Sequence, residues 1–525
     1  MAADSERSSG FPGGRAAWWT VLALLVAFVG LRYRAAWFSY ALDGYSDEPA
    51  VVDPALAAAR GDLRPAEFLY PGWSAYSIGA TYKALDVLGY GGAEGFLPEK
   101  AGPDHLVVAR LFVFGVSLAT LIATALIGRR VAGAWGGLAA AALLACSPMF
   151  TAMSFLVTVN PPASFWTAMA TLFALRVYQE GGKRSDYVLS AACAGLAIGC
   201  KYNAYPAALA VVLAHFFAPA SGRRLSNLVL AGVVVPVVFV ATTPYAVLEP
   251  ARFLEYVRFL GDVYEKEWPL HYDESGTSWL EYVARMVKFG WPWEMSASAL
   301  LGTALLLKSD WRRAAIVAVA PLLNFVFLGF YAVFFLRHLL PALPGLAVAS
   351  GVLVQACADR VAARREPASG GRTVLASVAA CVLVAGLGWR AFEQSAERVS
   401  RTELVDSRQA ALEWILANVP KGSRIVREDR TPVIEEHSAD YEVTFIRCIA
   451  EPDRTREAET HDYAVLSGMF DRFVRDPKFA AAREVYEQFY ARHELVRDFK
   501  GNGVEYSGRD VRIYRIDKDA SNVRK

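Results

Sequence analysis

Two adjacent carboxylates, Asp47 and Glu48, are the strongest chemical signal in the chain, within residues 43–49 (D-G-Y-S-D-E-P). They closely follow a long apolar segment, so we expect them at the edge of a hydrocarbon layer. Charged carboxylates are costly there, and they are useful if something needs a base or a cation ligand at that depth. The alternative is helix capping, because S-D-E-P is typical of a helix start and Pro49 fits the first turn of a helix over residues 50–60.

The elements that must position these carboxylates are long and apolar. The 525 residues are 54% hydrophobic and 20% charged, and the apolar residues occur in blocks, unlike those of soluble domains. We predict a mainly α fold, a polytopic membrane helix bundle whose first span is too long for a signal-peptide core. The eleven predicted spans are residues 18–37, 105–127, 131–146, 161–177, 187–200, 204–217, 225–247, 291–307, 313–333, 338–357 and 373–389.

Basic residues fall in alternate connections between these spans, which is typical of the cytoplasmic side of a membrane protein. The N-terminus, with Arg7 and Arg15, belongs to this side, and an odd number of spans puts the C-terminus on the extracytoplasmic side. The two long loops, residues 38–104 and 248–290, also fall on the extracytoplasmic side. The basic residues of the cytoplasmic connections are Arg129, Arg130, Lys183, Arg184, Arg223, Arg224, Lys308, Arg312, Arg313, Arg360, Arg364, Arg365 and Arg372.

The first long outer loop is acidic and partly helical by pattern. Residues 51–59 and 76–88 predict short helices, and the aromatic residues of segment 68–73 (F-L-Y-P-G-W) are typical of anchors at a membrane interface. We therefore expect interfacial helices in this loop, beside the two carboxylates.

Two short polar segments interrupt apolar runs on the same outer side: Lys201-Tyr202-Asn203 and Arg337-His338. The positive-inside bias predicts few cations there. For each cation alone, the alternative is an anchor that extends its charged end to the interface. Together, the two segments would line the surface that carries the carboxylates.

Histidine and cysteine usage predicts no metal site. His271, in the second long loop, is a single histidine, which is typical of a solvated loop. Five of the six cysteines lie in or at apolar segments, and Cys448 stands alone in the polar tail. No disulfide is therefore expected within the tail, and no cysteine spacing resembles a zinc site.

After Trp389 the composition becomes charged and soluble-like. Helices are predicted at residues 407–419 and 480–490, and strands at residues 423–426, 441–448, 461–467, 493–499 and 511–516. We therefore divide the chain into a membrane domain, residues 1–391, and a small extracytoplasmic α/β domain, residues 392–525. The tail has no nucleotide-binding loop or catalytic signature, which suits a lid or a packing module.

An outer carboxylate, outer cations and aromatic interfacial helices suit chemistry on a lipid-linked phosphate. A polyprenyl-phosphate sugar would lie with its chain in the bilayer and its phosphate at the outer face. A base must then deprotonate an acceptor hydroxyl, and cations must stabilise the departing phosphate. One carboxylate is enough for the proton transfer, because phosphate leaves as a stable anion and needs no acid of the kind that glycoside hydrolysis uses. Direct attack by the hydroxyl would invert the anomeric centre.

The order of these motifs resembles the GT-C glycosyltransferases, and more narrowly the bacterial relatives of dolichyl-phosphate-mannose protein mannosyltransferases and of the lipid A aminoarabinose transferase. The resemblance spans most of the membrane domain, and the tail segment 413–426 is also similar to bacterial members. It rests on order and topology more than on any one string. The motifs are D-E-P at residues 47–49, A-L-A at 55–57, F-L-Y-P at 68–71, K-Y-N at 201–203 and R-H-L-L-P at 337–341.

The resemblance implies that Asp47 is the base and that Glu48 positions the acceptor or donor. It also implies that Arg337 and Lys201 contact the donor phosphate. Many relatives carry an acidic residue where this chain has Asn160, so this chain either works without that acid or uses a different acceptor. The further candidate substrate contacts are Tyr70, Tyr202, Asn203, His271, His338 and Asn160.

We therefore expect an inverting glycosyltransferase for hexoses or pentoses in the cell membrane. Its expected partners are a polyprenyl-phosphate-linked sugar donor, a protein, lipid or glycan acceptor, and membrane lipids, with no nucleic acid. Charge for the phosphate can come from Arg337 and Lys201 alone or from a divalent cation held by acids. An oligosaccharide-transferring relative fits less well, because the tail lacks a W-W-D-Y-G-like string.

The alternative class is a transporter or flippase of a lipid-linked saccharide. Such proteins carry charges inside their spans along the transport route. Few charges lie in the middle of the predicted spans, and no clear inverted repeat is visible in the sequence.

Overall fold

The computed structural model describes residues 47–92, 95–220, 223–265, 279–331, 335–363, 371–468 and 479–518. Within this part of the chain there are two compact units, a helical unit up to residue 398 and a smaller unit from residue 399. The boundary between the units and the compositional boundary at residues 391 and 392 both fall within α16 (Gly371–Arg401). The first predicted span, residues 18–37, and His271 lie outside the described residues.

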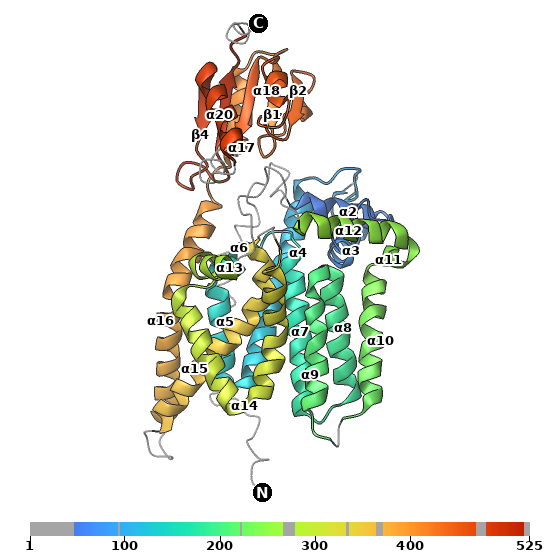
Figure 1. Cartoon of the computed structure of the whole chain (residues 1–525), viewed down its shortest axis with the longest axis vertical. Helices are drawn as coiled ribbons and strands as arrows, with labels where there is room; N and C mark the ends of the chain where they lie inside the picture. The colour runs from blue at the N-terminus through green and yellow to red at the C-terminus, as the bar shows by residue number, and fades with distance from the viewer. Residues whose placement is uncertain are drawn as a thin grey trace. The chain divides into compact units, whose positions relative to one another are not determined.

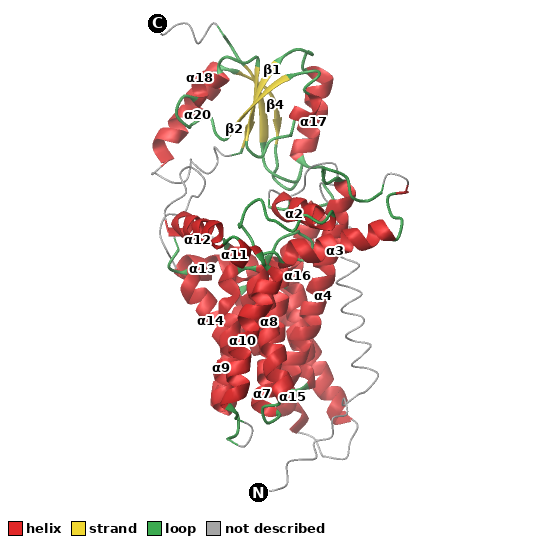
Figure 2. Cartoon of the chain, turned by 90° about the vertical axis from the view of Figure 1, so that its right-hand side faces the viewer, coloured by secondary structure: helices red, strands yellow, loops and turns green. Residues whose placement is uncertain are grey.

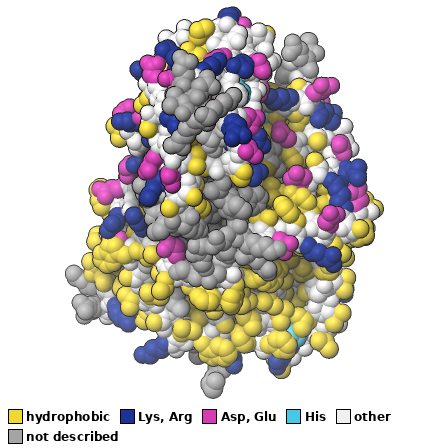
Figure 3. Space-filling view, turned by 45° about the horizontal axis from the view of Figure 1, so that its top comes forward, with side chains coloured by type: hydrophobic (Ala, Val, Ile, Leu, Met, Phe, Trp, Pro, Cys, Tyr) yellow, Lys and Arg dark blue, Asp and Glu magenta, His cyan; other side chains and the backbone are white. Residues whose placement is uncertain are grey.

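The helical unit is a bundle in which α7 packs against α8, α8 against α10, and α5 against α15 (Figure 1). Figure 3 shows hydrophobic side chains over the visible sides of the helical bundle, as expected for a surface in lipid. Besides α16, the bundle helices are α4 (Pro103–Val131), α5 (Ala134–Cys146), α7 (Asn160–Gln179), α8 (Arg184–Cys200), α9 (Leu209–Phe217), α10 (Leu225–Thr242), α14 (Trp293–Leu328) and α15 (Leu343–Ala363).

Five helical segments in the described part of the chain are long and apolar enough to cross a membrane. The other described bundle helices are either too short or not apolar enough to meet this description, so the total of eleven spans stays a prediction. The five segments are Pro103–Val131, Leu225–Thr242, Trp293–Leu328, Leu336–Ala363 and Val374–Arg401.

The longest helix, α14, consists of two halves joined at Asp310, whose backbone is not helical (φ −156°, ψ 86°). Gly302 in the first half lies against Ala349 of α15. Pro321 in the second half of α14 lies against Gly345 of α15, and Gly345 is only about one helical turn from Ala349. A straight helix would separate Gly302 from Pro321 by about 28 Å. The two halves of α14 therefore form a hairpin, which matches the two separate spans that the sequence predicts there.

One end of the bundle collects cations from the predicted cytoplasmic connections. Glu180 lies 2.8 Å from Arg130 and 3.3 Å from Lys183. Arg313, next to the bend of α14, donates to the Val131 carbonyl at 3.4 Å. These contacts join connections from separate parts of the chain, so the alternate basic connections lie together, as the sequence predicts. We call this end of the bundle the inner end.

The opposite, outer end carries short helices, among them α2 and α3 of the first long loop (Figure 1). These two helices pack closely, because a Cβ added at Gly79 would lie 2.5 Å from the Ala55 carbonyl oxygen. Tyr82 of α3 donates to the His105 carbonyl at 2.7 Å and so attaches the pair to α4. The short elements are α2 (Pro49–Ala59), α3 (Trp73–Val87), α6 (Pro148–Met153), η3 (Tyr202–Ala208), α11 (Tyr245–Leu248), α12 (Pro250–Glu265), α13 (Trp279–Arg285), η4 (Met286–Gly290) and η5 (Leu336–Ala342).

The C-terminal unit is a five-stranded sheet between two layers of helices (Figure 2). The strand order is β2-β1-β3-β5-β4, in which β1 pairs in parallel with β2 and β3, and β5 pairs antiparallel with β3 and β4. Successive strand residues face opposite sides, so Ile425 packs with α17 and Val426 with α20. The elements are α17 (Ser407–Asn418), β1 (Arg424–Glu428), η6 (Glu435–His437), β2 (Glu442–Ile446), α18 (Arg454–Ala458), β3 (Tyr463–Ser467), α20 (Ala480–Arg492), β4 (Glu494–Phe499) and β5 (Val511–Arg515).

Glu428, at the end of β1, is fully buried in this unit. Its carboxylate accepts hydrogen bonds from the amides of Ile449 at 2.9 Å and Ser467 at 3.0 Å, and from the Tyr486 hydroxyl. Burial raises the pKa of Glu428 to about 7, and the hydrogen bonds oppose that shift. The group therefore titrates near neutral pH.

Candidate active site

Asp47 and Arg337 form an ion pair at the outer end of the helical unit. Oδ2 of Asp47 lies 2.9 Å from Nη2 of Arg337, and the two side chains are 25% and 21% exposed. Arg337 lies in η5, and its guanidinium is 4.1 Å from the centroid of the Phe335 ring, a cation–π contact that helps to hold it in place. The residues expected to act as base and as phosphate contact are therefore direct neighbours.

Helix capping does not account for Asp47. The N-cap position of α2 is Glu48, and its side chain makes no capping hydrogen bond. Pro49 occupies the first turn, as the sequence predicts. The Asp47 carboxylate instead pairs with a cation that lies far along the chain.

Glu48 turns into the protein, where its carboxylate faces Arg110. It accepts hydrogen bonds from Nε and Nη2 of Arg110 at 2.8 and 2.6 Å, and neither side chain has exposed surface. The Val157 amide also donates to Glu48 at 3.0 Å. This buried position differs from the substrate contact expected for Glu48. Its contacts are those of a positioning residue that ties the start of α2 to α4 and to the segment before α7.

Lys201 and Asn160 form a second polar pair close to the first. Nζ of Lys201 donates to Oδ1 of Asn160 at 2.8 Å, and both side chains are buried. Lys201 lies in the turn between α8 and η3, and Asn160 is the first residue of α7. Burial lowers the pKa of Lys201 well below its usual range, Arg337 lowers it further, and Asp47 opposes the shift. Lys201 is therefore electrostatically coupled to the Asp47–Arg337 pair.

His338 follows Arg337 in η5 and is buried within electrostatic range of Lys201. Ser164 of α7 donates to the Leu340 carbonyl at 3.3 Å, which attaches η5 to the helix that begins with Asn160. The predicted site residues that meet here are Asp47, Asn160, Lys201, Arg337 and His338.

Three other predicted contacts lie around this group. Tyr202 donates its hydroxyl to the Phe68 carbonyl at 3.2 Å, which joins η3 to the first outer loop. Asn203 beside it is half-buried. Tyr70 lines a cavity in the outer loop.

This outer cavity has a volume of about 470 Å³ and lies against α2 and the start of α3. Its wall includes Asp53, Tyr70 and Ser74, together with Val159, the residue before Asn160. Ser74 is buried, and its hydroxyl has no hydrogen-bond partner among the described residues. A cavity of this size, lined by a carboxylate and by the Ser74 hydroxyl, can hold a polar ligand such as a sugar.

Among the described residues, no three histidine, cysteine, aspartate or glutamate side chains are grouped as metal ligands would be. The Arg337 guanidinium lies next to Asp47, and the amine of Lys201 lies within electrostatic range of both groups.

Arg110 is the residue of this region that sequence reasoning missed. The sequence feature that could have revealed Arg110 is its place inside the apolar run of residues 105–127. An arginine buried in a membrane span needs an acidic partner, so its presence there predicts one. The sequence does not identify that acid, since the pairing depends on how the outer loop packs against α4.

Comparison of the sequence with protein families matches residues 102–247 to the family described as dolichyl-phosphate-mannose-protein mannosyltransferase. The match covers α4 to α10 and therefore includes Arg110, Asn160 and Lys201. Comparison with curated proteins gives no match.

Three solved structures share the fold. ArnT from Cupriavidus metallidurans in the apo state has 15% sequence identity and a TM-score of 0.55, and the match covers 96% of this chain and 99% of that chain. The same protein bound to undecaprenyl phosphate has 13% identity and a TM-score of 0.52, with 96% and 98% covered. The oligosaccharyltransferase of Archaeoglobus fulgidus in the apo form has 13% identity and a TM-score of 0.58, with 89% and 72% covered.

Proposed function

We propose that this chain, which has the fold of the GT-C glycosyltransferases, transfers a sugar from a polyprenyl-phosphate donor to an acceptor hydroxyl at the outer end of its bundle. The observation that carries the proposal is the Asp47–Arg337 ion pair with Lys201 next to it. A proton acceptor and two cations at the edge of a membrane are what transfer from a lipid-linked phosphate requires.

The donor class is supported by the chemistry of the site and by the structural relatives. ArnT from Cupriavidus metallidurans has been solved with undecaprenyl phosphate, and AglB from Archaeoglobus fulgidus with dolichol-phosphate and an inhibitory peptide. In this chain, Arg337 offers a planar fork that matches phosphate oxygens, and Lys201 offers a compact second charge. We assign the donor phosphate to these two residues.

In the proposed reaction, Asp47 accepts the proton of the acceptor hydroxyl. The acceptor oxygen bonds to the anomeric carbon, and the bond from that carbon to the phosphate oxygen breaks. Its electron pair stays on the phosphate, where Arg337 and Lys201 stabilise the charge. Attack from the side opposite the phosphate inverts the anomeric centre, and no covalent intermediate with the protein forms.

The outer cavity is our candidate for the sugar or acceptor side of the reaction. The Ser74 hydroxyl and the Asp53 carboxylate can bind sugar hydroxyl groups, and Tyr70 offers a ring against which a sugar can pack. The wall residue Val159 adjoins Asn160, so the cavity adjoins the polar group around Lys201. The acceptor class stays open among hydroxyl groups of a protein, a lipid and a glycan.

We also propose that the outer end faces the extracytoplasmic side, with the N-terminus in the cytoplasm. The cations gathered at the inner end support this orientation, because basic connections are retained on the cytoplasmic side. The transport alternative receives less support, because Arg110, a charge inside a span, is buried against Glu48 and has no exposed surface.

The test is transfer from a panel of polyprenyl-phosphate hexoses and pentoses in membranes that contain the chain. Asp47→Asn preserves shape and removes the base, so release of polyprenyl phosphate and formation of glycosylated product should fall by about a hundredfold or more. Glu99→Gln, an exposed change in the same loop, is the matched control and should keep full activity. Full activity of a normally folded Asp47→Asn variant would reject the proposed base. Passage of donor across the membrane with no new glycosidic bond would favour transport.

A further inference from the structure

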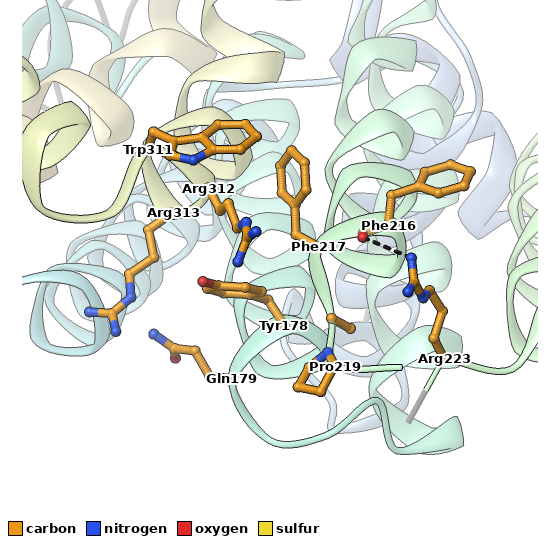
Figure 4. A pocket seen from close by; sticks show the side chains of 10 residues that line it. Tyr178, Gln179, Phe216, Phe217, Pro219, Arg223, Trp311, Arg312 and Arg313 are labelled. Atoms are coloured by element: carbon orange, nitrogen blue, oxygen red, sulfur yellow. Dashed lines mark hydrogen bonds between the residues drawn. The ribbon is translucent and has the colours of Figure 1, made fainter. Parts of the chain in front are cut away.

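A second cavity lies at the inner end of the helical unit (Figure 4). Its volume is about 750 Å³, and it is lined by residues 178–179, 216–219, 223 and 311–313. These residues belong to the end of α7, the end of α9 with the segment after it, and the bend of α14. We call this cavity the inner pocket. The proposed sugar transfer does not use it.

Three arginines line the inner pocket, and no acidic side chain is among its described lining residues, although Asp310 lies behind Tyr178 and accepts from its hydroxyl at 3.2 Å. Arg313 is balanced by Asp310, whose Oδ2 lies 2.9 Å from its Nε. Arg223 donates to the Phe216 carbonyl at 3.2 Å. Neither Arg223 nor Arg312 forms an ion pair with a carboxylate among the described residues. Two uncompensated guanidinium groups therefore face a cavity, which favours an anionic ligand.

The walls between these cations are aromatic. Phe217 and Trp311 meet edge to face with their centroids 5.0 Å apart, and Arg312 lies 5.6 Å from the centroid of the Trp311 ring. Figure 4 shows the Arg312 guanidinium between these rings and Tyr178 in that view. Trp311 is 53% exposed and Phe216 is 56% exposed, so the aromatic surface continues outside the pocket.

An apolar strip leads away from the pocket along α9 and α14, which pack against each other. Leu209 lies two turns from Phe216 on α9, and Leu322 lies three turns from Trp311 on α14. Both leucines are exposed and therefore face lipid on the same sides of their helices as the two aromatic residues. A ligand in the pocket would have apolar surface beside it along the bilayer.

We propose that the inner pocket binds the headgroup of an anionic phospholipid, with the phosphate on Arg223 and Arg312 and the acyl chains along the strip on α9 and α14. A soluble phosphate would use the charges and leave the aromatic walls and the strip unused. The inner end also carries the cations of the other basic connections, and the leaflet that basic connections face is the one rich in anionic lipids.

The test uses the full chain in nanodiscs of phosphatidylcholine with and without phosphatidylglycerol. Phosphatidylglycerol should be retained in preference to phosphatidylcholine after delipidation, measured by mass spectrometry of bound lipid. Arg223→Gln with Arg312→Gln should weaken this retention by about 30-fold. Arg184→Gln with Arg224→Gln removes the same charge from exposed positions at the same end, outside the pocket, and should change retention less than twofold.

Two further arms distinguish the sources of phosphate. Glycerol 3-phosphate and inorganic phosphate should not displace the lipid, whereas Phe216→Ser should weaken lipid retention with both arginines present. Displacement of phosphatidylglycerol by either soluble phosphate would overturn the lipid assignment, as would equal retention of the two lipids. An equal loss of lipid retention in the Arg184→Gln/Arg224→Gln control would mean that only the general charge of the inner end matters. That result would also overturn the lipid assignment. If the double variant unfolds in phosphatidylcholine, the Phe216→Ser result decides.

Discussion

The Asp47 carboxylate lies 2.9 Å from the Arg337 guanidinium, so the candidate base is neutralised by the candidate phosphate contact. In the proposed reaction, an arriving phosphate competes for the donors of Arg337 and loosens its hold on Asp47. The donor phosphate would thus exchange places with the Asp47 carboxylate on Arg337.

Replacing Arg337 by lysine keeps the charge and removes the planar fork that can serve a carboxylate and a phosphate together. We expect the KM for the polyprenyl-phosphate donor to rise by about tenfold, with a lower kcat. Steady-state kinetics in nanodiscs measure both constants. Arg390→Lys, at an exposed arginine 3.9 Å from Glu294, is the matched control. An unchanged donor KM in Arg337→Lys would remove Arg337 from the phosphate site.

Asn160→Asp should turn the contact with Lys201 into a buried ion pair. The present hydrogen bond, 2.8 Å from Nζ to Oδ1, leaves the lysine charge available to a phosphate, whereas a carboxylate would hold it. We expect the donor KM to rise by about tenfold, from the loss of one charge-assisted contact. The measurement is donor KM and kcat at a fixed acceptor concentration. A higher kcat with unchanged donor KM would show instead that an acid here helps the acceptor.

Glu48→Gln should destabilise the helical unit, because it removes the charge of the carboxylate that pairs with the buried Arg110. The expected loss is about 3 kcal/mol, whereas Glu494→Gln, which breaks an exposed pair with Arg515, should leave stability nearly unchanged. Unfolding in detergent, followed by temperature or denaturant, gives the comparison. Glu48→Gln with Arg110→Met should recover part of the loss. If the double variant is no better than Glu48→Gln, the ion pair is not the cause.

Glu428 should make the C-terminal unit less stable as pH rises. Burial raises its pKa from the ordinary 4.5 to about 7, so between these values the folded chain holds a proton that the unfolded chain releases. This stabilisation, about 3 kcal/mol, is fully present below pH 4.5 and is lost as pH rises through 7. Hydrogen exchange of the Ile449 and Ser467 amides, in the full chain and corrected for intrinsic rates, should show protection that falls from pH 5 to 8. Glu428→Gln should flatten that trend, and an unchanged slope would assign it to another group.

The local elements could be predicted from the sequence because periodicity and turn residues act over short distances. The helices at residues 407–419 and 480–490 and all five strands of the tail were predicted within a few residues of α17, α20 and β1 to β5. The strand order could not be predicted, because β1 lies between β2 and β3 through contacts that no local sequence pattern encodes.

The candidate site was predictable in part for a different reason. Membrane sidedness restricts which loops can meet, so Asp47, Lys201 and Arg337 could be assigned to one end of the bundle before any distance was known. The direction of each side chain could not be assigned in this way. Glu48 is adjacent to Asp47 in the sequence, yet it turns into the protein because α4 carries Arg110 at that depth.

The Glu48–Arg110 pair also has a consequence for biogenesis. Arg110 lies two turns from the start of α4, and an arginine inside an inserting helix is costly to transfer from the translocon to lipid. Synthesis proceeds from the N-terminus, so Glu48 has left the ribosome before Arg110 and is available as its counterion when α4 reaches the bilayer. Insertion of α4 is thereby coupled to docking of the segment ahead of it, and Glu48→Gln should lower the efficiency with which α4 inserts.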